Sequence, residues 1–218
     1  MSRQTDNLDT IAEQIRNGFA IKDATREKVL PLCREIIRYA STTIRTLHRQ
    51  EFGRAGELLL SARKLLEEAQ DTIKDATELK HTGFFRDAQK EFAEASITLA
   101  LVTQQATPTP EELGVDAAAY LNGLGEAVGE LRRYLLDSLR KEDLSRAEEL
   151  LDVMDDIYNI LVTMDYPDAI TFGLRRTTDL VRGILERTRS DLTLLIQQKS
   201  LEEKLRIFDD KHPQLKQD

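Results

Sequence analysis

Residues that build disulfides and tight turns are scarce in this chain of 218 residues. It has a single cysteine, Cys33, so an internal disulfide is excluded and a reducing compartment is expected. Ten glycines and five prolines are too few for the many turns of a β-sandwich or a β-barrel. No apolar run approaches the roughly 20 residues that span a bilayer, and the N-terminus lacks the apolar region of a signal peptide. We therefore expect a soluble, cytoplasmic protein with no membrane segment.

Charge and periodicity indicate the fold class. Acidic residues outnumber basic ones, and the net charge of −8 argues against indiscriminate nucleic-acid binding while leaving local basic stripes open. Apolar residues recur at helical spacing over most of the length. The sequence therefore predicts an all-α protein, a single domain over residues 1–218 with about seven long antiparallel helices and a polar tail from about residue 200.

Proline, glycine and polar clusters set the expected helix boundaries. Pro31 is expected to kink the second helix, and Ser145 with Glu148 has the spacing of a capping box. The expected helices span about 5–18, 22–50, 58 to before 83, 84–105, 117–140, 145–163 and 171–199, with a loop over 107–116.

Glutamates interrupt two segments that are otherwise free of charge. Glu94 is the only ionisable residue of 92–102, and Glu91 precedes it by one turn on the same face. The only charged residues of 117–131 are Glu126 and Glu130, which are again one turn apart. Buried carboxylates are costly, and like charges one turn apart repel. Such acids need an arginine, a shared proton or a divalent cation, and oxygen ligands suit Mg²⁺ or Mn²⁺. The alternative, that they face solvent or form structural salt bridges, carries similar weight.

Two stripes of arginines stand out on this acidic chain. The first stripe has spacings of 4, 7 and 4 residues, which place its members on one helix face: Arg34, Arg38, Arg45 and Arg49. The second recurs every seven residues: Arg175, Arg182 and Arg189. Either stripe can follow a phosphate backbone. A solvated or ion-paired face is the simpler interpretation, and no aromatic cluster beside the arginines indicates base stacking.

Three further features have structural interpretations. Gly123, Gly125 and Gly129 lie inside a helical pattern, where close helix packing explains them better than phosphate binding. Cys33 is expected in the core. His48, beside Arg49, is expected to cap a helix or to lie at the surface near a helix end.

Four segments together resemble the translin family. They are residues 32–49, 89–95, 120–132 and 150–161, which occur in the same order and at similar separations, within a resemblance that covers roughly residues 28–193. The resemblance implies a seven-helix fold that assembles into a closed, roughly octameric shell holding single-stranded or duplex nucleic acid. One branch, like translin, binds RNA and DNA. The other, like translin-associated factor X, carries a Mg²⁺-dependent endoribonuclease site.

The resemblance to the catalytic branch also implies site residues. Glu91 and Glu94 match a pair of catalytic glutamates, and Asp156 matches a third acid, with the neighbouring Asp155 left open. Glu126 and Glu130 fall where that branch also has acids. The implied catalytic residues are Glu91, Glu94 and Asp156, and the implied metal ligands are Glu91, Glu94, Glu126, Glu130 and Asp156. The basic N-terminal extension of the eukaryotic members is missing, so a compact, prokaryotic-type homo-oligomer is expected.

The sequence therefore predicts a Mg²⁺-dependent endoribonuclease that acts on single-stranded RNA, with Mn²⁺ as an alternative ion. The arginine stripes would hold the strand by its phosphates, which gives little sequence preference and leaves DNA binding open. The alternative is a non-catalytic, single-stranded RNA- or DNA-binding shell whose acids are structural. Convergence of the acids on the helices expected over 84–105, 117–140 and 145–163 favours the enzyme, and dispersed or arginine-neutralised acids favour the binding shell.

Overall fold

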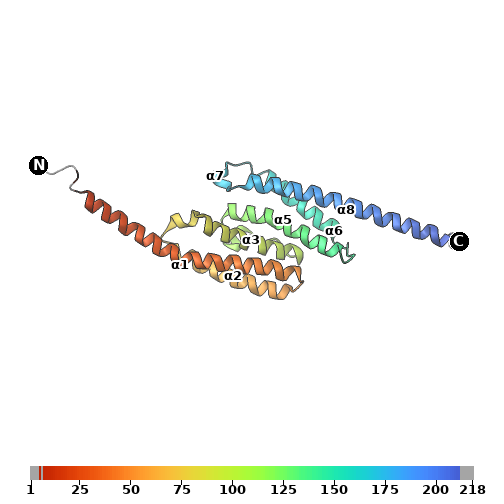
Figure 1. Cartoon of the computed structure of the whole chain (residues 1–218), viewed down its shortest axis with the longest axis horizontal. Helices are drawn as coiled ribbons and strands as arrows, with labels where there is room; N and C mark the ends of the chain where they lie inside the picture. Colours follow the sequence, from red (N-terminus) through yellow and green to blue (C-terminus); the bar gives the residue numbers. More distant parts are fainter. Residues whose placement is uncertain (1–4, 6, 212–218) are drawn as a thin grey trace.

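The chain folds into a bundle of long helices (Figure 1). The structure, a computed structural model, describes residue 5 and residues 7–211, and every regular element within them is helical, as predicted. The elements are α1 (Leu8–His48), α2 (Phe52–Thr72), the 3-10 helix η1 (Thr77–His81), α3 (Gly83–Val102), α4 (Pro110–Leu113), α5 (Ala117–Leu139), α6 (Ala147–Val162), α7 (Asp168–Thr171) and α8 (Leu174–Lys211). In the described part of the chain, no helix is both long and apolar enough to cross a membrane.

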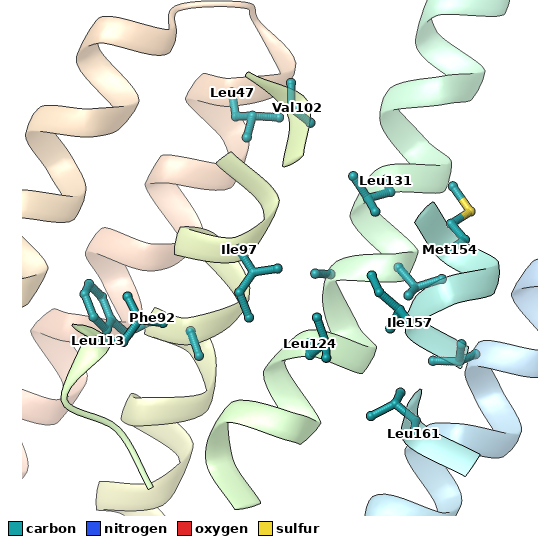
Figure 2. Close-up of a cluster of buried hydrophobic side chains, with 14 of the residues drawn as sticks. Leu47, Phe92, Ile97, Val102, Leu113, Leu124, Leu131, Met154, Ile157 and Leu161 are labelled. Atoms are coloured by element: carbon teal, nitrogen blue, oxygen red, sulfur yellow. The ribbon is translucent and has the colours of Figure 1, made fainter. Parts of the chain in front are cut away.

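One apolar core joins the long helices. Figure 1 shows α1 and α2 on one side, α3 and α5 in the middle, and α6 and α8 on the other side. The core is continuous from Val29 on α1 to Leu192 on α8. Figure 2 shows that α3, from Phe92 to Ile97, runs in the same direction as α5, from Leu124 to Leu131. This pair is therefore not antiparallel, since the connection through α4 returns the chain to the start of the bundle.

The first helix is continuous where the sequence predicted two. It runs from Leu8 to His48 without a break after Gly18, and Pro31 lies inside it without ending it. A glycine in a helix interior costs about 1 kcal/mol. Helix propagation tolerates such a penalty once the helix has formed. The first part of α1 projects beyond the bundle (Figure 1).

Two caps differ from the prediction. The expected loop over 107–116 contains α4, where the Thr109 hydroxyl accepts from the amide of Glu112 and the Glu112 carboxylate accepts from the amide of Thr109. The capping box expected at Ser145 does not form. Instead Arg146 donates to the carbonyls of Leu101 and Val102, so it satisfies the end of α3 rather than the start of α6. Arg146 thus finds its acceptors on a neighbouring helix, which the sequence around Ser145 does not reveal.

Three boundaries were also misplaced. The helix expected from residue 58 to before 83 ends at Thr72, followed by η1, and α8 begins at Leu174 and extends to Lys211. Residues 200–211, expected as part of a polar tail, are helical because Leu, Glu, Lys and Arg are strong helix formers even without burial. The rest of that tail, 212–218, lies outside the described residues.

Candidate functional site

Close packing of α3 and α5 determines the geometry of the site. A Cβ atom built at Gly123 would lie 2.7 Å from the carbonyl oxygen of Lys90 on α3. A Cβ at Gly125 would lie 2.4 Å from Cγ2 of Thr177 on α8. Glycine therefore allows α5 to approach both neighbours, which confirms the packing interpretation for these two positions. At Gly129 the nearest atom would be at an ordinary contact distance of 3.9 Å.

This approach brings three of the predicted acids together. Carboxylate oxygens of Glu91 and Glu94 on α3 and of Glu126 on α5 all lie within 4.8 Å of one another. The three side chains, which we call the acid cluster, are partly buried. Among the described residues no lysine, arginine or histidine lies within ion-pair distance of Glu94. The pair on α3 thus meets one of the two glutamates of α5, which is part of the predicted convergence, and a structural salt bridge does not account for Glu94.

Burial and like charges perturb the acid cluster. The pKa of Glu94 is raised to about 8, first by desolvation and then by the charges of Glu126, Glu91 and Glu130. Desolvation also raises the pKa of Glu91, although Lys90 opposes this shift. A carboxyl group whose pKa lies near neutral pH can bind either a proton or a cation.

Lys90 is the cation beside the acid cluster. Its Nζ lies 2.7 Å from Oε1 of Glu126 and 3.7 Å from Oε1 of Glu91. Burial lowers the pKa of Lys90, but the hydrogen bond and charge of Glu126 outweigh it, so the pKa is raised and the ammonium stays charged. Lys90 was not among the residues expected at the site, although its position directly before Glu91 on α3 was a usable signal.

The carboxylate of Glu130 pairs with His48 on α1. Its Oε2 lies 2.5 Å from Nε2 of His48 and 3.7 Å from Nη1 of Arg133. Glu130 is therefore not in the acid cluster, although its charge still acts on Glu94. The expectation that His48 caps a helix or lies at the surface was wrong, because its side chain is 5% exposed and bonded to α5.

The structure does not bring the acids of α6 to the acid cluster. Asp155 forms an ion pair with Arg189 on α8, at 3.1 Å. Asp156 is exposed, and neither aspartate belongs to the group whose oxygens can share an ion. Their turn of α6 packs on α5 and α8, so the match by sequence order did not translate into proximity within one chain.

The acid cluster fits a small divalent cation. Oxygen ligands lie 2.0–2.1 Å from Mg²⁺, so oxygens on opposite sides of the ion are about 4.2 Å apart. A spread of up to 4.8 Å between the carboxylate oxygens needs only small side-chain movements. All three ligands are hard oxygen donors, the type that Mg²⁺ and Mn²⁺ prefer.

The predicted arginines are exposed on the two outer helices. The first stripe lies on α1, where Arg38 bonds to Glu35 and Arg45 donates to Thr42 at 2.9 Å. The second lies on α8, where Arg182 pairs with Asp179 at 3.4 Å. The seven exposed side chains are Arg34, Arg38, Arg45, Arg49, Arg175, Arg182 and Arg189. Several are thus paired with acids, as the simpler interpretation expected, while remaining open to solvent. Cys33 is buried, and burial raises the pKa of its thiol to about 12.

Known proteins share both sequence and fold with this chain. No family model matches it. The uncharacterized protein MJ0175 of Methanocaldococcus jannaschii is 32% identical over 191 residues, which cover 87% of this chain and 85% of the relative. The crystal structure of AfC3PO matches with a TM-score of 0.76 and 34% identity, covering 83% of this chain and 94% of its own.

Two further solved structures are similar to this chain. A complex of AfC3PO with duplex RNA matches with a TM-score of 0.74 and 35% identity, over 83% of this chain and 93% of that one. Apo-NeC3PO, at 20% identity, shares the fold with a TM-score of 0.72 over 87% and 97% of the two chains. By sequence identity and by fold, this chain belongs to the translin family, which includes the C3PO proteins.

Proposed function

We propose that the chain is a Mg²⁺-dependent endoribonuclease that cleaves single-stranded RNA inside an oligomeric helical shell. One observation carries the proposal: three carboxylates from two helices converge within 4.8 Å, partly buried, and Glu94 has no ion-pair partner in the described part of the chain. Desolvated acids of this kind repel one another, and a hard cation relieves the repulsion.

Each residue of the acid cluster has a defined task in this proposal. Glu91, Glu94 and Glu126 hold one ion, with Mn²⁺ able to replace Mg²⁺. When bound, such an ion lowers the pKa of a water molecule and neutralises charge on the scissile phosphate. Glu94 would bind the ion as the carboxylate, so it is the ligand that would have to lose a proton, because its pKa of about 8 keeps it largely protonated near neutral pH. Asp156 and Glu130 receive no role as ligands, since one is exposed on α6 and the other bonds to His48.

RNA as the substrate class rests on the relatives and on the arginines. AfC3PO, 35% identical to this chain, has been solved with duplex RNA. The exposed arginines of α1 and α8 can neutralise phosphates without reading bases, so single-stranded DNA is a second ligand of the same surface.

Assembly into a homo-oligomeric, octamer-like shell is part of the same proposal. The projecting part of α1 exposes apolar side chains at helical spacing: Leu8, Ile11, Ile15 and Phe19. The far end of α8 does the same with Leu194, Leu201 and Leu205. These two helix ends project from opposite ends of the bundle (Figure 1). Large exposed apolar stripes mark interaction surfaces, and a second copy of the chain is the partner that we propose for them.

The substitution Glu94→Gln tests the catalytic role. It keeps the shape of the side chain and removes the charge that would hold the ion. We expect cleavage of single-stranded RNA in Mg²⁺ to fall to background. The melting temperature is expected not to fall, and particle mass by light scattering and RNA affinity without divalent ions are expected to be kept. Glu57→Gln, on the exposed side of α2, is the matched control and is expected to cleave like the natural chain. A Glu94→Gln variant that is destabilised yet fully active would end the assignment.

A non-catalytic nucleic-acid-binding shell is the second candidate. The ion pair between Lys90 and Glu126 favours it, because an internal cation already neutralises part of the acid cluster. On this alternative, the natural chain binds RNA but does not cleave it in Mg²⁺ or Mn²⁺, and Glu94→Gln changes neither property.

A further inference from the structure

Lys90 occupies the side of the acid cluster where an ion would neutralise Glu91 and Glu126. Its ammonium contacts both carboxylates, at 3.7 and 2.7 Å, and these two acids are proposed ligands of the ion. A divalent cation bound by the same oxygens would meet the ammonium at close range, and like charges at a few ångströms repel strongly in a partly buried site. Lys90 and the ion therefore compete for the same carboxylates.

A pocket lies next to Lys90. It has a volume of about 410 Å³ and lies between α3, α5 and the start of α8. The pocket is lined by two acids, Glu126 and Asp87, and by the cations Lys90, Arg86 and Arg176, together with Phe172. A flexible lysine can turn from the carboxylates into this pocket without moving its backbone.

Arg86 gives this pocket an unmet hydrogen-bond donor. Its guanidinium lies 3.5 Å from the ring centre of Phe172, and its Nη1 is buried without a hydrogen-bond partner among the described residues. Phe172 is held in the left-handed region, at φ 49°, which is costly for a residue other than glycine. A buried donor without a partner is also costly. A phosphate oxygen satisfies such a donor, whereas the left-handed Phe172 is the C-cap of α7.

We propose that Lys90 is a tethered counterion that links the binding of the divalent ion to the binding of RNA. Without the ion it neutralises Glu91 and Glu126. When the ion enters, Lys90 turns into the pocket beside Arg86 and Arg176 and binds a phosphate of the strand. A phosphate in the pocket in turn draws Lys90 away from the carboxylates, so each ligand increases the affinity of the other by the same factor. The inference rests on the proposed function, because it takes the acid cluster as the ion site.

The experiment measures Mn²⁺ binding by calorimetry at one fixed pH, with and without single-stranded RNA whose integrity is checked on a gel after each titration. In Lys90→Gln no ammonium competes with the ion for the carboxylates. Without RNA, Mn²⁺ is therefore expected to bind this variant on the order of tenfold more tightly than the natural chain. The further increase in Mn²⁺ affinity on adding RNA is expected to be correspondingly smaller. In the natural chain, Mn²⁺ is expected to steepen the salt dependence of RNA binding, because Lys90 then contacts a phosphate. In Lys90→Gln this steepening is expected to be smaller by about 0.7 in slope, the contribution of one phosphate contact with a single strand. Lys90→Arg keeps the charge and is expected to follow the natural chain.

Lys22→Gln is the matched control. It removes an ion pair of equal length, 2.7 Å to Glu78, far from the acid cluster, and is expected to leave Mn²⁺ affinity unchanged. If the natural chain binds Mn²⁺ and Lys90→Gln binds it with equal affinity and equal coupling to RNA, the role of Lys90 is overturned while the proposed function stands. If only Lys90→Gln binds Mn²⁺, the role of Lys90 is supported and the metal-dependent function of the natural chain is overturned. Failure of both chains to bind Mn²⁺ overturns both.

Discussion

Nε2 of His48, at the end of α1, lies 2.5 Å from Oε2 of Glu130 on α5. The other ring nitrogen, Nδ1, is buried, has no hydrogen-bond partner among the described residues and lies 3.9 Å from Oδ2 of Asp137. This contact ties the end of α1, which carries two of the exposed arginines, to the helix that supplies Glu126. It also keeps Glu130 engaged, so that the acid cluster consists of three glutamates.

Replacing His48 by leucine is expected to lower the free energy of unfolding by roughly 1–3 kcal/mol. The substitution fills the space but leaves the Glu130 carboxylate without its buried partner. Urea denaturation measures the difference. Arg133→Leu removes the more exposed neighbour of Glu130 and is expected to cost less than about 1 kcal/mol. Equal stability of the His48 variant and the natural chain would show that the contact is not structural.

Gly123→Ala is expected to destabilise the protein by roughly 1–3 kcal/mol. The new methyl would lie 2.7 Å from a main-chain oxygen of α3, which cannot rotate away, so α5 must shift. The same shift moves Glu126 away from Glu91 and Glu94, so Mn²⁺ affinity is expected to fall as well. Gly183→Ala, in α8 with nothing within 4 Å of the new Cβ, is expected to stabilise by up to about 1 kcal/mol. Thermal melts and Mn²⁺ titrations of both variants check this contrast.

Stability without divalent ions is expected to fall as the pH rises towards 8. The folded pKa of Glu94, about 8, lies above its unfolded value of roughly 4.3, so the folded state binds this proton more tightly. The contribution is complete below the unfolded pKa and is lost as the pH rises through the folded one, at up to about 1.4 kcal/mol per pH unit. Urea denaturation between pH 5 and 9 in a chelator measures it. Glu94→Gln is expected to flatten this slope, and identical slopes would contradict the raised pKa.

Charge reversal at Arg38 and Arg45 tests the basic stripe of α1. If both side chains contact phosphates, changing them to glutamate weakens RNA binding and lowers its salt dependence by at least about 0.7 in slope for each lost contact with a single strand. Fluorescence anisotropy over a range of salt concentrations measures both effects. Arg54→Glu, at an exposed position of α2 outside both stripes, is the control for net charge. An unchanged affinity and slope would identify the stripe as an ion-paired, solvated face.

The helical fold was predictable because its signal is local. Apolar periodicity reports the face of a helix that packs, and it located every long helix except for the false break in α1. Caps were less predictable. The sequence match at Ser145 and Glu148 was sound, yet Arg146 found a partner in the carbonyls at the end of α3, 44 and 45 residues away in the chain.

The candidate site also has a part that was predictable from the sequence and a part that was not. The sequence alone places Glu94 and Glu126 in segments too apolar for ordinary surface acids, with Glu91 one turn before Glu94, because the cost of burying a charge is visible in composition. Which of these acids meet depends on the tertiary structure. The approach of α5 to α3 at Gly123 brings Glu126 to the pair on α3, whereas His48 engages Glu130 and α6 leaves Asp156 exposed. Spacing along one helix fixes a side chain's direction, but distances between helices depend on how closely their backbones pack.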